Sequence, residues 1–307
     1  MTEDTAQKTN ESSSIFIRDV ARVDCAIFDP SRGIIGQSWH LDVEISGNVD
    51  ENFFVYDFSH LKKLVKNVAK TSIDHALLIP VSGQMVNFIE SPNGEKWELV
   101  SSSKFSKKSQ WNYLCPQGAV FPMRAIVLKP SIIEQEFNRL LRHRLSESII
   151  GVKIKLREEA SEPSTAFFRY THGIEGHDGL CQRLFHGHRS RIEVEVGGER
   201  RPDLEHYLCR EVLGSEVHIA TPSQVTNGKI ACGTRGTEGE MIELEYRSSL
   251  GLYYATLPAS KVFMIDHETS IESLTNQLAQ LVRKKIGNLE KVQVRCFEGI
   301  DKGAVVE

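Results

Sequence analysis

The chain has 307 residues, of which 40% are hydrophobic and 25% are charged, and its formal net charge is −4. That balance is typical of a folded globular protein and gives no electrostatic reason to expect a nucleic acid or an anionic membrane as a partner. No apolar run approaches the ~20 residues that span a bilayer, and the polar N-terminus lacks the apolar segment of a signal peptide. We therefore expect a cytoplasmic protein whose cysteines are free thiols.

The first half of the chain predicts a series of strands and helices. After a polar leader, residues 1–14, strands are expected over 15–28 and 38–46. A helix follows in "VYDFSHLKKLVKNVAK", with Asp57 or Ser59 as its N-cap. The later elements are a strand in "SIDHALLIP", a loop-rich stretch near 90–118, a strand over 119–128, a helix over 131–146 and a strand in "IIGVKIKLRE".

The second half repeats this order after a polar linker, residues 158–165. Its elements are a strand over 166–171, a strand in "RIEVEV", a helix in "RPDLEHYLCREVL", a strand in "VHIATP", a loop-rich stretch near 226–240, strands over 241–257, a helix over 269–285 and a strand in "KVQVRCFEG". The recurrence favours a tandem duplication, with one domain at 15–158 and another at 165–307. A single mixed domain is the alternative.

The stretch "LCQRLFHGHRSRIEVEV" places two histidines at the start of a strand. Residues i and i+2 of a strand share a face, so His186 and His188 project together. His172, at the end of the preceding strand, can join them from an antiparallel neighbour. Three imidazoles leave one tetrahedral position open, which is typical of catalytic zinc. The pattern predicts Zn2+ on these histidines, and solvated histidines at a strand end are the alternative.

Cys181 followed by His-Gly-His, with His172 upstream, resembles the 6-pyruvoyl-tetrahydropterin synthase and 6-carboxytetrahydropterin synthase family. The segment "VYDFSHLKKLVKNVAKTSIDHALL" resembles the same family in the first half. The resemblance implies an α+β protein of two tandem tunnelling-fold (T-fold) domains, each an antiparallel sheet with helices on one face. It also implies a homo-oligomer, a trimer or a dimer of two-domain chains, because this fold joins sheets edge to edge.

The two halves differ at the positions that bind metal in such a family. Ile35 and Gln37 stand where the second half has His186 and His188, and Asp24 stands near the end of the first strand, where no histidine is found. The first domain is therefore expected to bind no metal.

The acid/base residues implied by the resemblance are also divided between the halves. The first half carries an Asp-His pair, Asp74 and His75, whereas the second half carries Cys181, the expected thiolate base. We expect composite sites in which Asp74-His75 of a first domain meets the zinc and Cys181 of a second domain. Asp266-His267 and His218 are the alternatives for the acid/base.

The resemblance also suggests residues that bind the pterin ring. Glu298, on the last strand, matches a glutamate that accepts hydrogen bonds from an aminopyrimidinone edge, and Glu158 occupies the matching place in the first half. Thr269 and Ser270 match a pterin-contacting pair, although a helix N-cap would also explain them.

The function implied is a zinc-dependent pterin synthase acting on 7,8-dihydroneopterin triphosphate. We expect 6-carboxy-5,6,7,8-tetrahydropterin synthase, a lyase that feeds deazapurine (queuosine-type) synthesis, and 6-pyruvoyl-tetrahydropterin synthase is the alternative. A non-catalytic pterin- or purine-binding protein is the alternative from another class. A zinc hydrolase of unrelated fold would instead depend on Glu175 or Asp178.

Overall fold

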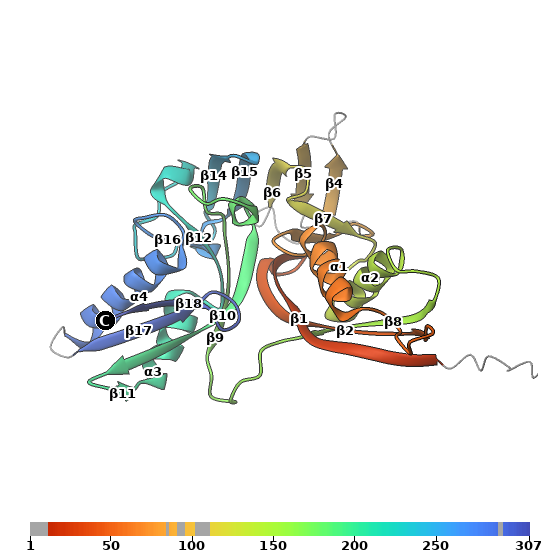
Figure 1. Cartoon of the computed structure of the whole chain (residues 1–307). Helices are drawn as coiled ribbons and strands as arrows, with labels where there is room; N and C mark the ends of the chain where they lie inside the picture. The colour runs from red at the N-terminus through yellow and green to blue at the C-terminus, as the bar shows by residue number, and fades with distance from the viewer. Residues whose placement is uncertain (1–11, 84–85, 91–95, 102–110, 288–290) are drawn as a thin grey trace, which may run out of the picture. The chain divides into compact units, whose positions relative to one another are not determined.

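The computed structural model describes residues 12–83, 86–90, 96–101, 111–287 and 291–307. Three sheets and a small number of helices make up this part of the chain, which confirms the predicted α+β class (Figure 1). Residues 1–11 of the predicted leader lie outside the described residues, and the first strand already begins at Ser12. No helix in the described ranges is both long enough and apolar enough to cross a membrane.

The first sheet has five strands in the order β7-β3-β1-β2-β8. Its strands are β1 (Ser12–Asp29), β2 (Gly33–Asn48), β3 (Leu77–Pro80), β7 (Val120–Met123) and β8 (Ile149–Arg157). Two helices accompany it, α1 (Phe58–Lys70) and α2 (Pro130–Arg142). The Asp57 side chain accepts a hydrogen bond from the His60 amide, 2.8 Å away, which identifies Asp57 rather than Ser59 as the N-cap of α1.

The second sheet has the order β16-β12-β9-β10-β17-β18, and β11 pairs with β10. Its strands are β9 (Phe167–His172), β10 (His186–Val196), β11 (Glu199–Arg200), β12 (Glu216–Ala220), β16 (Val262–Met264), β17 (Val292–Phe297) and β18 (Gly303–Val306). The predicted helix over 201–213 is a short α3 (Pro202–His206) followed by a π-helical segment, Tyr207–Val212. The last helix, α4 (Ile271–Ile286), begins after its N-cap Ser270.

A third sheet joins segments from both halves of the sequence, in the order β13-β14-β15-β6-β5-β4. Its strands are β4 (Val86–Glu90), β5 (Lys96–Ser101), β6 (Asn112–Pro116), β13 (Val225–Asn227), β14 (Met241–Ser248) and β15 (Gly251–Pro258). The stretch near 90–118, expected to be rich in loops, therefore contributes strands, although residues 91–95 and 102–110 lie outside the described residues. The pairing of Tyr254 with Leu114 joins the two halves within this sheet.

The first and second sheets have the same strand order over five corresponding strands. In each, a short strand that follows the first helical segment pairs in parallel with the first strand of the opening hairpin, as in Ala26 with Leu77 and Val217 with Tyr170. A second short strand pairs in parallel with this one, β7 with β3 and β16 with β12. Parallel pairs need a crossover connection, which contains a helical segment in the first case and strands of the third sheet in the second. The sheets are therefore mixed rather than wholly antiparallel. The shared order is what a duplication would give, and the duplication itself stays a prediction.

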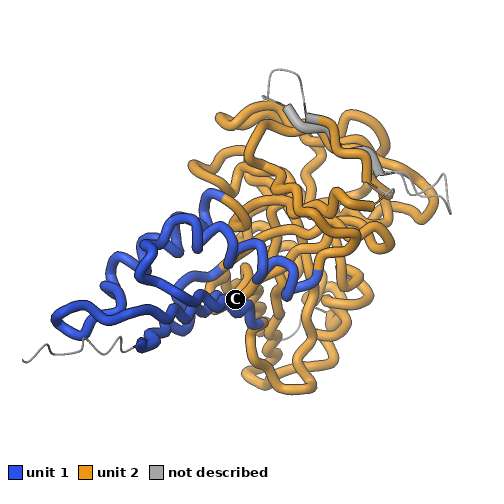
Figure 2. The backbone as a smooth tube through the Cα atoms, turned by 90° about the vertical axis from the view of Figure 1, so that its right-hand side faces the viewer, with its two compact units in different colours: residues 1–22, 40–71, 129–157 blue, residues 23–39, 72–128, 158–307 orange. Residues whose placement is uncertain are grey.

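The described chain divides into two compact units that do not follow the two halves of the sequence (Figure 2). Unit 1 comprises residues 1–22, 40–71 and 129–157, and unit 2 comprises residues 23–39, 72–128 and 158–307. Strands β1 and β2 each contribute to both units. Unit 2 thus contains the second half of the chain together with two pieces of the first half, and the tandem domains at 15–158 and 165–307 stay a prediction.

Two hydrophobic cores lie among the described residues of unit 2. One lies between the second sheet and its helices, where Phe168, Val194 and Leu278 are all fully buried. The other lies against the third sheet and includes Tyr246 and Trp111. Burial of this apolar surface holds in place the strand ends and loops that carry the polar residues considered next.

Candidate metal and catalytic site

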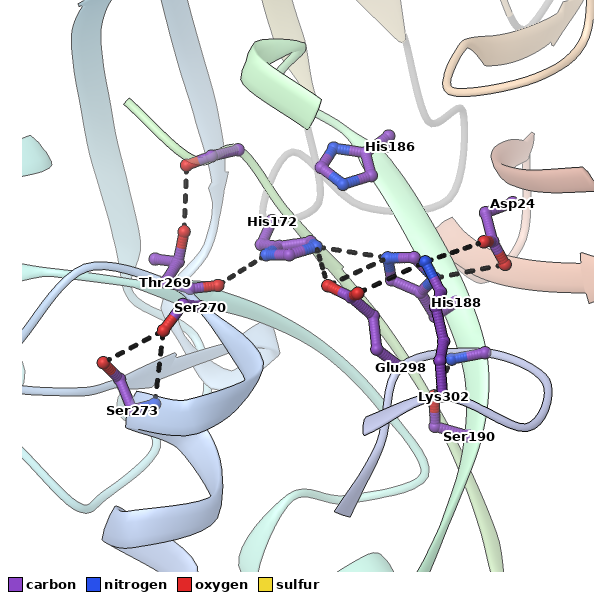
Figure 3. Close-up of polar contacts among 12 residues, drawn as sticks. Asp24, His172, His186, His188, Ser190, Thr269, Ser270, Ser273, Glu298 and Lys302 are labelled. Carbon is purple, nitrogen blue, oxygen red and sulfur yellow. Dashed lines mark hydrogen bonds and ion pairs between the residues drawn. The ribbon is translucent and has the colours of Figure 1, made fainter. Parts of the chain in front are cut away.

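Three histidines converge at the junction of β9 and β10 (Figure 3). The antiparallel register pairs His172 directly with His186, and His188 lies two residues further along β10 on the same face. All three side chains are buried, and their nitrogens form a group in which the donor atoms lie within 4.8 Å of one another. The register of one strand pair thus brings the three predicted metal ligands together.

Each of these imidazoles turns its Nδ1 toward an oxygen atom. The Nδ1 of His172 lies 2.6 Å from the Thr269 carbonyl, and that of His186 lies 2.9 Å from the Arg183 carbonyl. The Nδ1 of His188 lies 3.2 Å from a carboxylate oxygen of Asp24. An N–H at each Nδ1 leaves the Nε2 lone pair for a metal, as is usual for histidine ligands.

The arrangement of the three Nε2 atoms fits a divalent cation. The Nε2 atoms of His172 and His188 lie 3.2 Å apart, close to the ~3.3 Å expected between two nitrogens on one tetrahedral zinc. The Nε2 of His186 is buried without a hydrogen-bond partner. Burial lowers the pKa of His172 to about 3 and holds the pKa of His186 well below its usual value. Both rings are therefore neutral, as metal binding requires.

Cys181 and His75 form a second group of donors that shares His186. The ligand atoms of His75, Cys181 and His186 lie within 4.8 Å of one another, and the rings of His75 and His186 stack with centroids 5.1 Å apart. Asp74 lies 3.1 Å from the Nδ1 of His75. The structure thus brings the first-half pair Asp74-His75 to Cys181 of the same chain, inside unit 2.

The electrostatic setting of His75 favours its charged form. Burial lowers the pKa of His75, but hydrogen bonds and charge interactions with Asp74 and Cys181 outweigh this and raise it to about 10. The backbone of His75 is left-handed, with φ 53°, which is uncommon for a residue other than glycine. Its amide donates to the Asp24 carbonyl at 2.6 Å. A strained residue tied down in this way is typical of a functional site.

The third sheet holds the loop that carries Cys181. The hydroxyl of Tyr246 donates to the Gln182 carbonyl, and the hydroxyl of Tyr113 donates to the Leu184 carbonyl. The amide and hydroxyl of Ser249 also donate to the Gln182 side chain, at 2.9 and 2.8 Å. Strand β6, in a stretch expected to be rich in loops, and strand β14, where a strand was expected, therefore fix the backbone on the C-terminal side of the thiol.

Glu298 lies beside the three histidines. One carboxylate oxygen lies 4.0 Å from the Nε2 of His172 and 3.9 Å from that of His188, and the other lies 3.2 Å from the Lys302 ammonium. By contrast, Glu158 is paired with Arg169 at 3.0 Å and with Arg189 at 3.3 Å, and it accepts a hydrogen bond from Gln37. Of the two matching glutamates, only Glu298 lies beside the three histidines.

Thr269 and Ser270 have structural partners in this site. The hydroxyl of Thr269 donates to the Gly173 carbonyl at 2.9 Å, while its own carbonyl accepts from His172. Ser270 caps α4 by accepting from the Ser273 amide at 3.3 Å. Their predicted contact with a pterin stays a prediction.

The alternative acid/base residues lie elsewhere. Asp266 and His267 are exposed, and neither belongs to the two donor groups. His218 is buried against the hydroxyl of Thr171, 3.0 Å away, and burial lowers its pKa to about 3. Glu175 and Asp178 are also exposed.

Asp24 and Lys302 belong to the site although the sequence did not single them out as functional. Burial raises the pKa of Asp24, but His188, Lys302 and Ser38 outweigh it and hold the pKa well below its usual range. Lys302 lies 3.4 Å from Asp24. The sequence gives one signal for Asp24, which stands near the position where the second half has a histidine. It gives none for Lys302, because a lysine close to a strand usually lies in solvent.

Comparisons with known proteins agree with the family resemblance. Residues 21–96 match the family model described as 6-pyruvoyl tetrahydropterin synthase, which confirms the resemblance over that segment. It includes Asp24 and Asp74-His75 and ends before the histidines of the second half.

The chain also matches solved structures of two 6-pyruvoyl tetrahydropterin synthases. The enzyme from Plasmodium falciparum is 19% identical with a TM-score of 0.38, and the alignment covers 48% of this chain and 91% of that chain. The enzyme from Plasmodium vivax is 16% identical with a TM-score of 0.40, and the alignment covers 50% and 94%. No curated protein matches the chain.

Proposed function

We propose that the chain is a zinc-dependent pterin synthase that acts on 7,8-dihydroneopterin triphosphate and forms 6-carboxy-5,6,7,8-tetrahydropterin. The observation that carries this proposal is the meeting of three buried Nε2 atoms with Cys181 and the Asp74-His75 pair. His172, His186 and His188 would hold the zinc and leave a fourth position for the substrate. When bound, zinc acts as a Lewis acid that acidifies protons of the coordinated side chain of the substrate.

The protein's own groups would move those protons. Cys181, as a thiolate, would accept a proton from the substrate side chain, and the charged form of His75 next to it would stabilise that thiolate. Asp74, 3.1 Å from the Nδ1 of His75, would fix the ring orientation and tautomer. The raised pKa of His75 keeps the ring protonated at neutral pH, so that it carries a proton to donate.

Glu298 would bind the pterin ring. Its carboxylate can accept the N–H and NH₂ of an aminopyrimidinone edge, and Lys302 would keep the carboxylate ionised. Glu158 is a poorer candidate because two arginines already bind it.

The 6-pyruvoyl-tetrahydropterin reaction is the second candidate, because the family model matched by residues 21–96 carries that description. The two reactions differ in what leaves the substrate: triphosphate alone in the pyruvoyl reaction, and a side-chain fragment as well in the carboxy reaction. Both would need the same metal, thiolate and imidazole.

Mass spectrometry of the products formed by zinc-loaded protein from 7,8-dihydroneopterin triphosphate tests the proposal. A 6-carboxy product is expected. Loss of triphosphate alone would assign the pyruvoyl reaction, and substrate binding without turnover would identify a non-catalytic pterin-binding protein.

The role of His75 has its own test, His75→Asn. Asparagine tolerates the left-handed backbone, so the change removes the imidazole with little added strain. Turnover is expected to fall by about 10²–10⁴-fold, the usual contribution of general acid–base catalysis. Zinc content, measured by atomic emission, should not change. Full activity in this variant would contradict the assignment of the acid/base to His75.

We also propose a cytoplasmic homo-oligomer, a trimer or a dimer of chains. Strands β8 and β18 stand at the edges of their sheets, and exposed edges favour pairing with another chain. Native mass spectrometry would give the number of chains, and a monomer at working concentration would refute this part of the proposal.

A further inference from the structure

The hairpin β1–β2 places a buried carboxylate beside the three histidines of the proposed zinc site (Figure 3). Asp24 lies on β1 and is only 6% exposed. One of its oxygens lies 3.2 Å from the Nδ1 of His188 and accepts a hydrogen bond from the Ser38 hydroxyl at 2.5 Å. The other oxygen lies 3.4 Å from the Lys302 ammonium. The carboxylate is thus bound on both sides, with one side facing a predicted metal ligand.

His188 differs from the other two histidines in the charge of this partner. The Nδ1 atoms of His172 and His186 face main-chain carbonyls, which are neutral. A carboxylate on Nδ1 raises the basicity of the opposite nitrogen more than a carbonyl does, and it fixes the ring orientation. His188 would therefore be the strongest donor of the three.

Gly299 packs so closely against Asp24 and His188 that a larger residue would not fit at position 299. A Cβ added to Gly299 would lie 2.5 Å from the Asp24 oxygen, 2.8 Å from the Ser38 hydroxyl and 3.3 Å from the Nδ1 of His188. The Gly299 amide donates to the Ser190 hydroxyl at 3.0 Å, which holds this close approach. The loop after β17 therefore covers the carboxylate–imidazole pair and separates it from water.

The main chain of Asp24 also contacts the proposed acid/base. Its amide donates to the Asp74 carboxylate at 3.1 Å, and its carbonyl accepts from the His75 amide at 2.6 Å. One residue therefore contacts a metal ligand through its side chain and the Asp74-His75 pair through its backbone.

We infer that Asp24 is a positioning residue for zinc: through His188 it sets the geometry and affinity of a site whose ligands all lie in the other half of the chain. This inference rests on the zinc site of the proposed function. It assigns to the half without metal ligands a part in metal binding that is separate from its Asp-His pair.

The variant Asp24→Asn tests the inference, because it keeps the shape of the side chain and removes the charge. The zinc affinity of the purified full chain, measured by competition with a chromophoric chelator, is expected to fall by about 10–100-fold, as for other carboxylate partners of ligating histidines. The visible spectrum of the cobalt-loaded protein should shift, because the spectrum reports ligand geometry. A stability change alone would not produce that shift.

Two further variants allow the inference to be tested even if Asp24→Asn folds poorly, and they provide a control. Ser38→Ala removes only the hydroxyl that holds Asp24, so a smaller loss of zinc affinity is expected even if Asp24→Asn folds poorly. Asp29→Asn is the matched control, because Asp29 ends the same strand but binds Ser31 and Arg32 of the turn. Its zinc affinity should equal that of the wild type.

Unchanged zinc affinity and an unchanged cobalt spectrum in folded Asp24→Asn would overturn the inference. This outcome is distinguishable from failure of the proposed function. If the wild type binds zinc but does not convert 7,8-dihydroneopterin triphosphate, the proposed reaction fails, while the affinity ratio between wild type and variant still decides the role of Asp24.

Discussion

The hairpins β1–β2 and β9–β10 occupy corresponding places in their sheets, but their side chains differ at the start of the second strand. Where β10 has His186 and His188, β2 has Ile35 and Gln37. The amide of Gln37 binds Glu158 and Arg169, so an ion-pair cluster stands at the position that corresponds to His188. The difference teaches that a hairpin without the three histidines still reaches them, because a carboxylate oxygen of Asp24 on β1 lies 3.2 Å from the Nδ1 of His188.

The two hairpins also meet through glycines at matching positions. A Cβ on Gly187 would lie 2.8 Å from the Cα of Gly36, and a Cβ on Gly36 would lie 2.7 Å from the His188 amide nitrogen. The glycine between the two histidines is therefore required by packing, whatever the metal. It brings the backbone of β2 against the strand that carries the ligands.

The largest expected effect is a loss of turnover on replacing Cys181, in contrast to replacing Cys25 in the other half. Cys181→Ala removes the proposed base, and turnover should fall by about 10²–10⁴-fold with zinc retained. Cys25 is fully buried, and burial together with the charges of Asp74 and Asp24 raises the pKa of its thiol well above the usual value. Cys25→Ala should therefore leave the rate of the chemical step nearly unchanged.

Single-turnover kinetics with 7,8-dihydroneopterin triphosphate would measure both variants. If Cys25→Ala lost as much activity as Cys181→Ala, while its thermal unfolding matched that of the wild type, the division of roles between the hairpins would be wrong.

A smaller effect contrasts the two glutamates. Glu298→Gln removes a charged acceptor from the proposed pterin site, and KM should rise by about 10–100-fold, since hydrogen bonds to charged groups contribute about 1.5–3 kcal/mol. Glu158→Gln breaks ion pairs with Arg169 and Arg189 at a carboxylate that is 43% exposed, so its effect on KM should be slight. Steady-state kinetics would separate them, and a larger KM change in Glu158→Gln would reverse the assignment.

The smallest expected effect is on stability, in variants of the glycines at which the two hairpins meet. Gly36→Ala and Gly187→Ala should each lower the free energy of unfolding by about 1–3 kcal/mol, because the added methyl overpacks a backbone contact. Gly176→Ala is the control, since the nearest atom to its Cβ would be a Glu268 carboxylate oxygen at 3.6 Å. Denaturant unfolding of zinc-free protein would measure all three. Equal stabilities would show that the hairpins do not depend on this contact.

Much of the site could be predicted from the sequence because its signals are local. The spacing of His186 and His188 and the strand ending at His172 follow from the two-residue period of a strand. The pairing of Asp74-His75 with Cys181 depended on family resemblance, since periodicity alone does not place segments so far apart in the chain. In unit 2 the Asp74-His75 pair lies close to Cys181, and the composite catalytic sites stay a prediction.

What could not be predicted depends on contacts between distant segments. The third sheet joins β6 to β15, and no local pattern in either strand specifies the other as partner. No pattern in the sequence distinguishes Tyr113 and Tyr246 from ordinary core aromatic residues, yet their hydroxyls donate hydrogen bonds to the loop that carries Cys181. Asp24 was treated as a missing histidine because its partner lies in the other half.

The span of sequence that supplies the site has a consequence for protein synthesis. Asp24 is translated early, whereas Lys302, which neutralises it, is among the last residues of this sequence. The Asp24 carboxylate therefore lacks this partner until residue 302 has left the ribosome. Contacts between residues far apart in the sequence form slowly, so we expect the Asp24–Lys302 ion pair to be among the later contacts in folding.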